Sequence, residues 1–139
     1  ILLRATLPAY TEHSQVLALV QARRNEGFEL WISRQVLREF LAQVTRPQNF
    51  MILMPIAEAA KRVEEFESGY SLADENADVT RQLISLLKKY PSGGKQIHDA
   101  NIVATMLVNG IDTLLTLNVD DMKRFSSEIK IVSLTSEES

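Results

Sequence analysis

The segment GKQIHDANIVATMLVNGIDTLLTLNVDDMKRF, residues 94–125, decides the fold of this chain. Apolar residues recur at helical spacing in its first half and stop at Gly110, which predicts a helix over residues 99–109. The apolar run that follows predicts a buried strand over 113–117, and residues 119–125 predict a short helix. This succession of helix, buried strand and helix is typical of a parallel sheet covered by helices.

One acidic residue of the first helix, Asp99, is placed unusually. At about 100° per residue it shares a face with Ile102, Val103 and Met106, so we expect it to point inward. A lone ionised carboxylate among apolar side chains is costly, and it must meet a cation, bond backbone donors or become neutral. Asp99 is therefore a candidate functional group, although a helix cap that bonds the N–H of Ile102 is equally open.

The segments upstream continue the same alternation of strands and helices. FELWIS, residues 28–33, predicts a strand that runs directly into a helix capped by Ser33 and ended by Pro47. The other predicted elements are helices between Thr11 and Gly27, over 56–68 and over 77–90, and strands over 70–73 and 129–134. The helix after FELWIS is predicted to pack through one apolar stripe, Val36, Leu37, Phe40, Leu41 and Val44. The helix over 56–68 is predicted to turn Ile56, Ala59, Ala60, Val63 and Phe66 inward.

Strands separated by helices imply parallel pairing with right-handed crossovers, hence a sheet with helices on both faces. The predicted class is therefore α/β. A chain of 139 residues is long enough for one domain with a sizeable core. We place this domain at residues 1–134 and a polar tail at 135–139. The abrupt apolar start ILLRA, without Met, is interpreted as a truncated or processed amino terminus.

Composition excludes several kinds of protein. The chain has no cysteine, so it has neither disulfides nor a thiolate zinc site, which is compatible with a reducing cytoplasm. The net charge of -3 excludes a broadly basic nucleic-acid binder, so any such contact must be local. Basic clusters, including Arg34 with Arg38 and Lys88 with Lys95, are interpreted as solvated helix faces. No apolar run approaches the roughly 20 residues that span a bilayer, so we expect a soluble protein.

Several oxygen-bearing side chains are predicted to meet at one edge of the sheet. Ligand sites of open parallel sheets form beyond the carboxyl ends of the strands, where Asn118, Asp120 and Asp121 follow the buried strand. Asp99 and Glu39, which opens the second turn of the helix after FELWIS, are expected to face the same edge. Carboxylate and amide oxygens suit Mg²⁺ or Mn²⁺. Taken singly, each of these residues is also an ordinary solvated or capping group.

Three stretches together resemble the PIN-domain family, in particular the VapC-type toxins of bacterial toxin–antitoxin pairs. They are ISRQVLREFLAQVTRP, GKQIHDANIVATM and LLTLNVDDMKRF, and the last is similar to the closing motif T-x-N-x-x-D-F, with Met122 in place of its Phe. The resemblance covers nearly the whole chain. It implies a three-layer α/β/α sandwich on a central, mostly parallel sheet, and Mg²⁺- or Mn²⁺-dependent hydrolysis of single-stranded RNA.

The resemblance also implies roles for individual residues. Glu39 and Asp99 match the metal-site acids, Asn118 and Asp121 match the polar positions of the closing motif, and Thr116 matches its hydroxyl position. Asp120 remains a secondary candidate. His98, which is adjacent to Asp99, is interpreted as a surface histidine, with contact to substrate as the alternative. The family further implies a homodimer in the cytoplasm and inhibition by a small antitoxin protein whose tail lies across the site.

One family feature is absent from this sequence. The first acid of the family lies in a D-x-N motif at the end of the first strand, directly upstream of a segment resembling ILLRA. We therefore expect the first metal ligand and one core strand to lie upstream of Ile1. The main hypothesis is an endoribonuclease in which this acid joins Glu39 and Asp99. The alternative is a non-catalytic PIN-like module that binds RNA or a protein partner.

Overall fold

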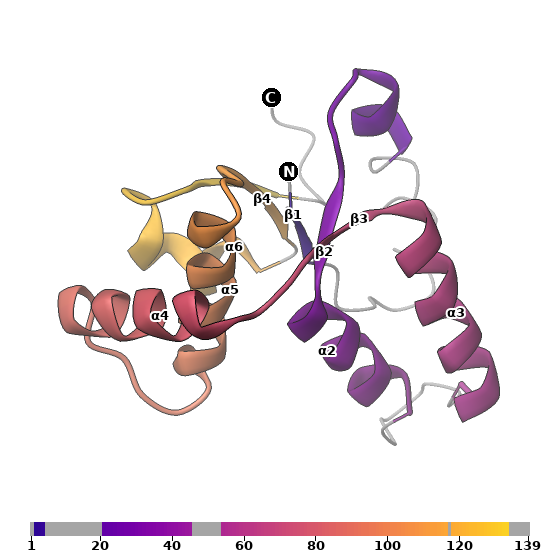
Figure 1. Cartoon of the computed structure of the whole chain (residues 1–139), viewed down its shortest axis with the longest axis horizontal. Helices are drawn as coiled ribbons and strands as arrows, with labels where there is room; N and C mark the ends of the chain where they lie inside the picture. The colour runs from indigo at the N-terminus through magenta and orange to yellow at the C-terminus, as the bar shows by residue number, and fades with distance from the viewer. Residues whose placement is uncertain (1, 5–20, 46–53, 117, 134–139) are drawn as a thin grey trace.

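The computed structural model of the chain describes residues 2–4, 21–45, 54–116 and 118–133 (Figure 1). Within these ranges, five short strands form one sheet in the order β3-β2-β1-β4-β5, and all four neighbouring pairs are parallel. The elements are β1 (Leu2–Arg4), β2 (Trp31–Ser33), α2 (Arg34–Thr45), α3 (Ile56–Gly69), β3 (Ser71–Ala73), α4 (Ala77–Lys89), α5 (Gln96–Val108), β4 (Thr113–Thr116), α6 (Val119–Met122), the 3₁₀ turn η1 (Lys123–Phe125) and β5 (Lys130–Ser133).

The helices lie in two groups on either side of the strands. Figure 1 shows α4 and α5 on the left of the view and α2 and α3 on the right, with the strands between them. The buried residues of β1, β2 and β4 form one core with α2, α4 and α5, while α2 and α3 share a second apolar cluster. The predicted α/β class with a parallel sheet is confirmed.

Helix α2 begins where the sequence predicts, immediately after β2. The Ser33 hydroxyl accepts the backbone N–H of Val36 at 3.1 Å, which satisfies one of the donors left free at a helix start. Val36, Leu37, Phe40 and Val44 are all buried, so the apolar stripe read from the sequence is the face that packs. Replacing the cap with alanine typically costs about 1 kcal/mol.

Helix α5 is the most buried helix of the described chain, but its start differs from the prediction. It begins at Gln96 rather than Asp99, because turn bonds to the carbonyls of Gly93 and Gly94 lead directly into it. Gly94 adopts φ +60°, a conformation that side chains disfavour. Asp99 is therefore inside the first turn of α5 and is not the residue that caps it.

Strand register aligns the edge of the sheet where the candidate residues lie. In β4, Leu114, Leu115 and Thr116 are buried, as predicted for a strand covered on both faces. Thr116 pairs with Arg4 of β1 on one side and with Ser133 of β5 on the other. The carboxyl ends of these three strands are therefore level, and the segments that leave them begin at the same edge.

Two predictions about packing were wrong in detail. FELWIS forms a strand only at Trp31–Ser33, because the described residues of β3 pair with those three positions alone. Ile56, predicted to point inward, is 66% exposed at the first position of α3. Met54, which is partly buried, packs against Phe40 and its neighbours just before the helix.

Some predictions fall outside the described residues. These are most of the helix after Thr11, the end at Pro47, residue 117 and the tail 135–139. Residues 21–25 are helical, and Gly27 has φ 94°, as a helix stop requires. Leu2–Arg4 forms the central strand of the described sheet, while the strand expected upstream of Ile1 and the domain boundary at 134 stay predictions.

None of the helices in the described part of the chain is long and apolar enough to cross a membrane.

Candidate functional site

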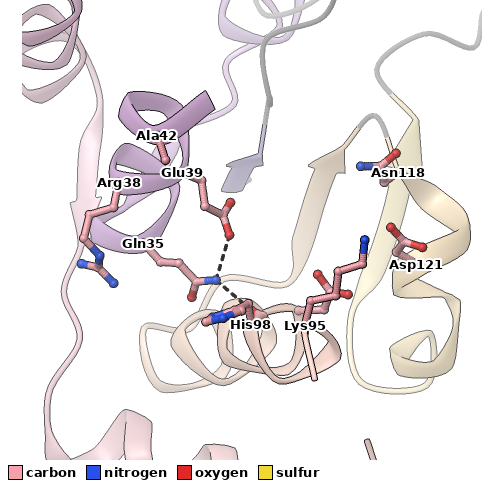
Figure 2. A pocket seen from close by; sticks show the side chains of 9 residues that line it. Gln35, Arg38, Glu39, Ala42, Lys95, His98, Asn118 and Asp121 are labelled. Atoms are coloured by element: carbon pink, nitrogen blue, oxygen red, sulfur yellow. Dashed lines mark hydrogen bonds between the residues drawn. The ribbon is translucent and has the colours of Figure 1, made fainter. Parts of the chain in front are cut away.

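A pocket of about 420 Å³ lies beyond the carboxyl ends of β2 and β4 (Figure 2). Its walls come from α2, from the first turn of α5 and its preceding residue, and from α6 and its preceding residue. The lining residues are Gln35, Arg38, Glu39, Ala42, Lys95, His98, Asp99, Asn118 and Asp121. This is the edge at which ligand sites of open parallel sheets form.

The structure brings together the four residues that the sequence singled out for a metal site. Glu39, Asp99, Asn118 and Asp121 all line this pocket, although as many as 82 positions separate them, from 39 to 121. Figure 2 shows the carboxylate of Glu39 on one wall and the side chains of Asn118 and Asp121 on the opposite wall. The predicted juxtaposition is therefore present, while the chemical role of each residue stays a prediction.

The environment of Asp99 differs from the prediction. Ile102, Val103 and Met106 are fully buried, whereas Asp99 is only partly buried and lines the open pocket. The reason is its place in the first turn of α5, where the apolar face of the helix emerges from the core at the edge of the sheet. The carboxylate therefore stands at the end of the apolar stripe and is not enclosed by it.

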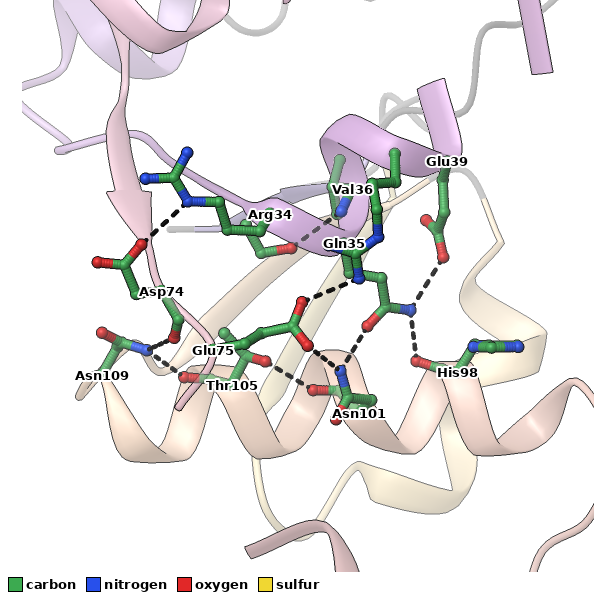
Figure 3. A network of polar contacts seen from close by, with 12 residues as sticks. Arg34, Gln35, Val36, Glu39, Asp74, Glu75, His98, Asn101, Thr105 and Asn109 are labelled. Atoms are coloured by element: carbon green, nitrogen blue, oxygen red, sulfur yellow. Dashed lines mark hydrogen bonds and ion pairs between the residues drawn. The ribbon is translucent and has the colours of Figure 1, made fainter. Parts of the chain in front are cut away.

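A hydrogen bond within α2 orients the carboxylate of Glu39. The side-chain amide of Gln35, one turn earlier, donates to Glu39 Oε2 at 3.0 Å and to the carbonyl oxygen of His98 at 2.9 Å (Figure 3). Glu39 is itself partly buried. The acid of α2 is therefore connected to the turn of α5 that carries Asp99.

The wall that carries Asn118 and Asp121 is held in place by buried groups of β4, α6 and η1. The Thr116 hydroxyl accepts the backbone N–H of Asn118 at 3.1 Å, and Thr116 is only 1% exposed. Met122 and Phe125, which follow within α6 and η1, are completely buried and fix this short segment to the core. Asn118 and Asp121 remain exposed at the pocket.

Asp120 belongs to a neighbouring hollow and has a different partner. It is exposed and forms an ion pair with Lys123 Nζ at 2.8 Å. The hydrogen bond from Lys123 lowers the pKa of Asp120 below its ordinary value, and the charge of Lys123 acts in the same direction. Asp120 lines an adjoining pocket of about 200 Å³ together with Asn118, Asp121 and Ser133. Asp120 does not line the main pocket, and its place as a secondary candidate stays a prediction.

Two basic residues of the pocket were missed by sequence reasoning. Arg38 and Lys95 are exposed, as their interpretation as solvated groups predicts, and both also line the pocket beside the acids. Arg38 also forms an ion pair with Glu75 at 3.2 Å. Their positions offered a signal, because Arg38 directly precedes Glu39 and Lys95 lies four residues, or about one helical turn, before Asp99.

The pocket offers the type of ligand atom, oxygen, that a hard divalent cation prefers. Three carboxylates and one amide supply the oxygen ligands that Mg²⁺ and Mn²⁺ prefer. Among the described residues, however, no three acidic, histidine or cysteine side chains gather closely enough to hold a metal ion by themselves. The described donors thus match the chemistry of such a site without forming a complete set of ligands.

Comparison with known proteins adds one finding. The family model of the PIN domain matches residues 6–128, which include every lining residue of the pocket. No curated protein matches this chain.

Proposed function

This chain belongs to the PIN domain family, which is of nuclease type, and from that premise we propose that it is a metal-dependent endoribonuclease. The proposed activity is hydrolysis of phosphodiester bonds in single-stranded RNA, as the toxin of a VapC-type toxin–antitoxin pair. The observation that carries this proposal is the convergence of Glu39, Asp99, Asn118 and Asp121 on one pocket.

In this proposal Glu39 and Asp99 hold Mg²⁺ or Mn²⁺ together with the acid expected upstream of Ile1. Asn118 and Asp121 adjust the ion directly or through water. When bound, such a cation lowers the pKa of water and offsets negative charge on a phosphate. The donor types support this assignment, and the need for a further ligand is consistent with the incomplete set among the described residues.

The basic residues of the pocket have a separate task in the proposal. Arg38 and Lys95 donate to phosphate oxygens of the RNA and hold the strand against the acids, which would otherwise repel it. Phosphate contacts of this kind fix position without reading sequence. His98, which is exposed in the first turn of α5, is proposed as a further contact for the RNA.

The test is cleavage of a labelled single-stranded RNA by the intact protein, with its natural amino terminus, in Mg²⁺ or Mn²⁺. We expect Asp99→Asn to abolish cleavage, because the amide keeps the size of the side chain but loses the charge that binds the ion. Asp78→Asn is the matched control, since Asp78 occupies the first turn of α4 as Asp99 does in α5. Cleavage by Asp99→Asn at the wild-type rate would remove the proposed mechanism.

A second candidate is a non-catalytic PIN-like module that binds RNA or a protein partner. It is favoured by the lack of three closely grouped metal-ligating side chains among the described residues. RNA binding without cleavage in either metal would support the module over the enzyme.

The partners and location are also part of the proposal. We infer a homodimer in the cytoplasm, inhibited by a small antitoxin protein. A short neighbouring reading frame whose product binds the chain and suppresses cleavage would support this inference. A monomer at micromolar concentration in size-exclusion chromatography would contradict the homodimer.

A further inference from the structure

A buried amide, that of Gln35, interrupts the apolar face of α2. Gln35 is 5% exposed and is followed by the buried Val36 and Leu37. A polar side chain in such a position is costly unless its hydrogen-bonding groups are satisfied. The bonding partners of this amide therefore decide whether its burial beside the candidate site is costly.

Every hydrogen-bonding group of the Gln35 side chain has a partner. Its two N–H groups have Glu39 Oε2 and the His98 carbonyl as acceptors, at 3.0 and 2.9 Å. Its Oε1 accepts from Asn101 Nδ2 at 2.8 Å. The reverse orientation would turn an oxygen toward two acceptors and an N–H toward a donor, so one orientation is fixed.

The residues around Gln35 are themselves connected (Figure 3). Asn101 Nδ2 also donates to Glu75 Oε2 at 3.2 Å, and Arg38 donates to the other oxygen of Glu75 at 3.2 Å. Figure 3 shows this network extending from α2 across to α5 and to Glu75, in the loop after β3. Because groups of α2 and α5 bond both the nitrogen and the oxygen of the amide, Gln35 has little freedom to turn.

One nitrogen atom thus connects α2, which carries Glu39, with the turn of α5 that carries Asp99. The N–H groups of Gln35 Nε2 hold the Glu39 carboxylate and the carbonyl of His98, which is the residue before Asp99. We propose that Gln35 is a positioning residue that sets the location of the Glu39 carboxylate relative to Asp99. This role rests on the proposed metal-dependent function, and Gln35 itself is not proposed to contact the ion.

The test uses the full chain with its natural amino terminus and measures Mn²⁺ binding by calorimetry. Gln35→Met keeps a similar volume but removes all three hydrogen bonds. Loss of a group that orients metal ligands typically weakens metal binding by about 10- to 100-fold, which is the decrease we expect. We also expect kcat to fall while KM for RNA stays unchanged, because Lys95 is untouched. Gln82→Met on α4, outside the pocket lining, is the matched control and should bind Mn²⁺ as the wild type does.

A second variant covers the case in which Gln35→Met does not fold. Asn101→Ala removes the donor to Gln35 Oε1 from a partly buried residue that does not line the pocket. It should weaken Mn²⁺ binding in the same direction, by a smaller factor.

The outcomes separate this inference from the function on which it rests. Wild-type Mn²⁺ affinity in whichever of the two variants folds would overturn the positioning role and leave the enzyme intact. Failure of the wild-type chain itself to bind Mn²⁺ would overturn the metal-dependent function, and the positioning role with it.

Discussion

The hydroxyl of Thr116 accepts the backbone N–H of Asn118 at 3.1 Å, at the point where β4 ends. The bond spans a single intervening residue and belongs to a threonine that is only 1% exposed. The bond therefore helps to hold the backbone of Asn118 beside the end of β4. Asn118, which directly precedes α6, is thereby held at the wall of the pocket.

Thr116→Val should destabilise the protein and lower RNA cleavage. Valine nearly matches the shape of threonine but removes the acceptor of the partly buried Asn118 N–H, which costs about 1 kcal/mol. Urea denaturation measures this loss. Thr105→Val is the control, because the Thr105 hydroxyl donates within α5 to the carbonyl of Asn101 and its loss leaves no backbone donor unpaired. Equal losses in both variants would argue against a special role for Thr116.

Asp121→Asn and Asp120→Asn should differ, although the residues are adjacent. Asp121 lines the pocket with Glu39 and Asp99, whereas Asp120 is paired with Lys123 beside it. We expect Asp121→Asn to reduce RNA cleavage by about 10-fold or more, as loss of a group near a metal does. Asp120→Asn should keep most of the activity. Initial rates at saturating Mg²⁺ compare the two, and similar losses would place Asp120 in the site as well.

Lys95→Met should weaken RNA binding more than it slows the chemical step. Lys95 lines the pocket from an exposed position, which suits a phosphate contact. Losing one such contact should raise KM by about 3- to 10-fold, equivalent to roughly 1 kcal/mol. The slope of log affinity against log salt concentration should fall by about 0.7. Lys61→Met on α3 is the control, and an unchanged salt slope in Lys95→Met would exclude the contact.

Glu128 should make stability depend on pH at the opposite end of the described core. Lys89 Nζ and the Tyr90 hydroxyl both lie within hydrogen-bond distance of Glu128 Oε2, at 2.8 and 2.9 Å. The bond from Lys89, followed by that from Tyr90, lowers the pKa of Glu128 below its ordinary value of 4.5. Between the lowered pKa and the ordinary value of 4.5, the unfolded chain therefore binds more protons at Glu128 than the folded chain does. The stabilisation is complete above pH 4.5 and is lost as the pH falls through the lowered pKa.

Glu128→Gln tests this expectation by urea denaturation at several pH values. The wild type should exceed the variant in free energy of unfolding at pH 7, and the difference should shrink as the solution is acidified below pH 4.5. Glu64→Gln, at an exposed position of α3, should show no such trend. A difference that is constant across pH would mean that the glutamate acts by packing alone.

Features that follow from local patterns, or from the general rule that parallel strands end at one edge, were predicted well from the sequence. Ser33 caps α2 as expected because a cap needs only the residue three positions on. The buried stripe of α2 and the meeting of Glu39 with Asp121 at one pocket follow from helical periodicity and from parallel strands ending at one edge. These inferences need no knowledge of which helices touch.

Features that depend on contacts between distant segments were not predicted. Gln35 is buried because its amide meets the His98 carbonyl, 63 residues away, and no local pattern contains that information. Ile56 is exposed because Met54 takes the inner position against α2. The start of α5 at Gln96 follows from the turn at Gly94, whereas the sequence pattern predicted a start at Asp99.

The order in which the walls of the pocket occur along the chain bears on synthesis. A chain still emerging from the ribosome contains α2 and α5 before Asn118 and Asp121 are added. The growing polypeptide therefore lacks one wall until residues 118–121 have been added. A premature stop before residue 118 would release a product without half of the four proposed ligands, and a cell making such a fragment would be spared the proposed attack on its RNA.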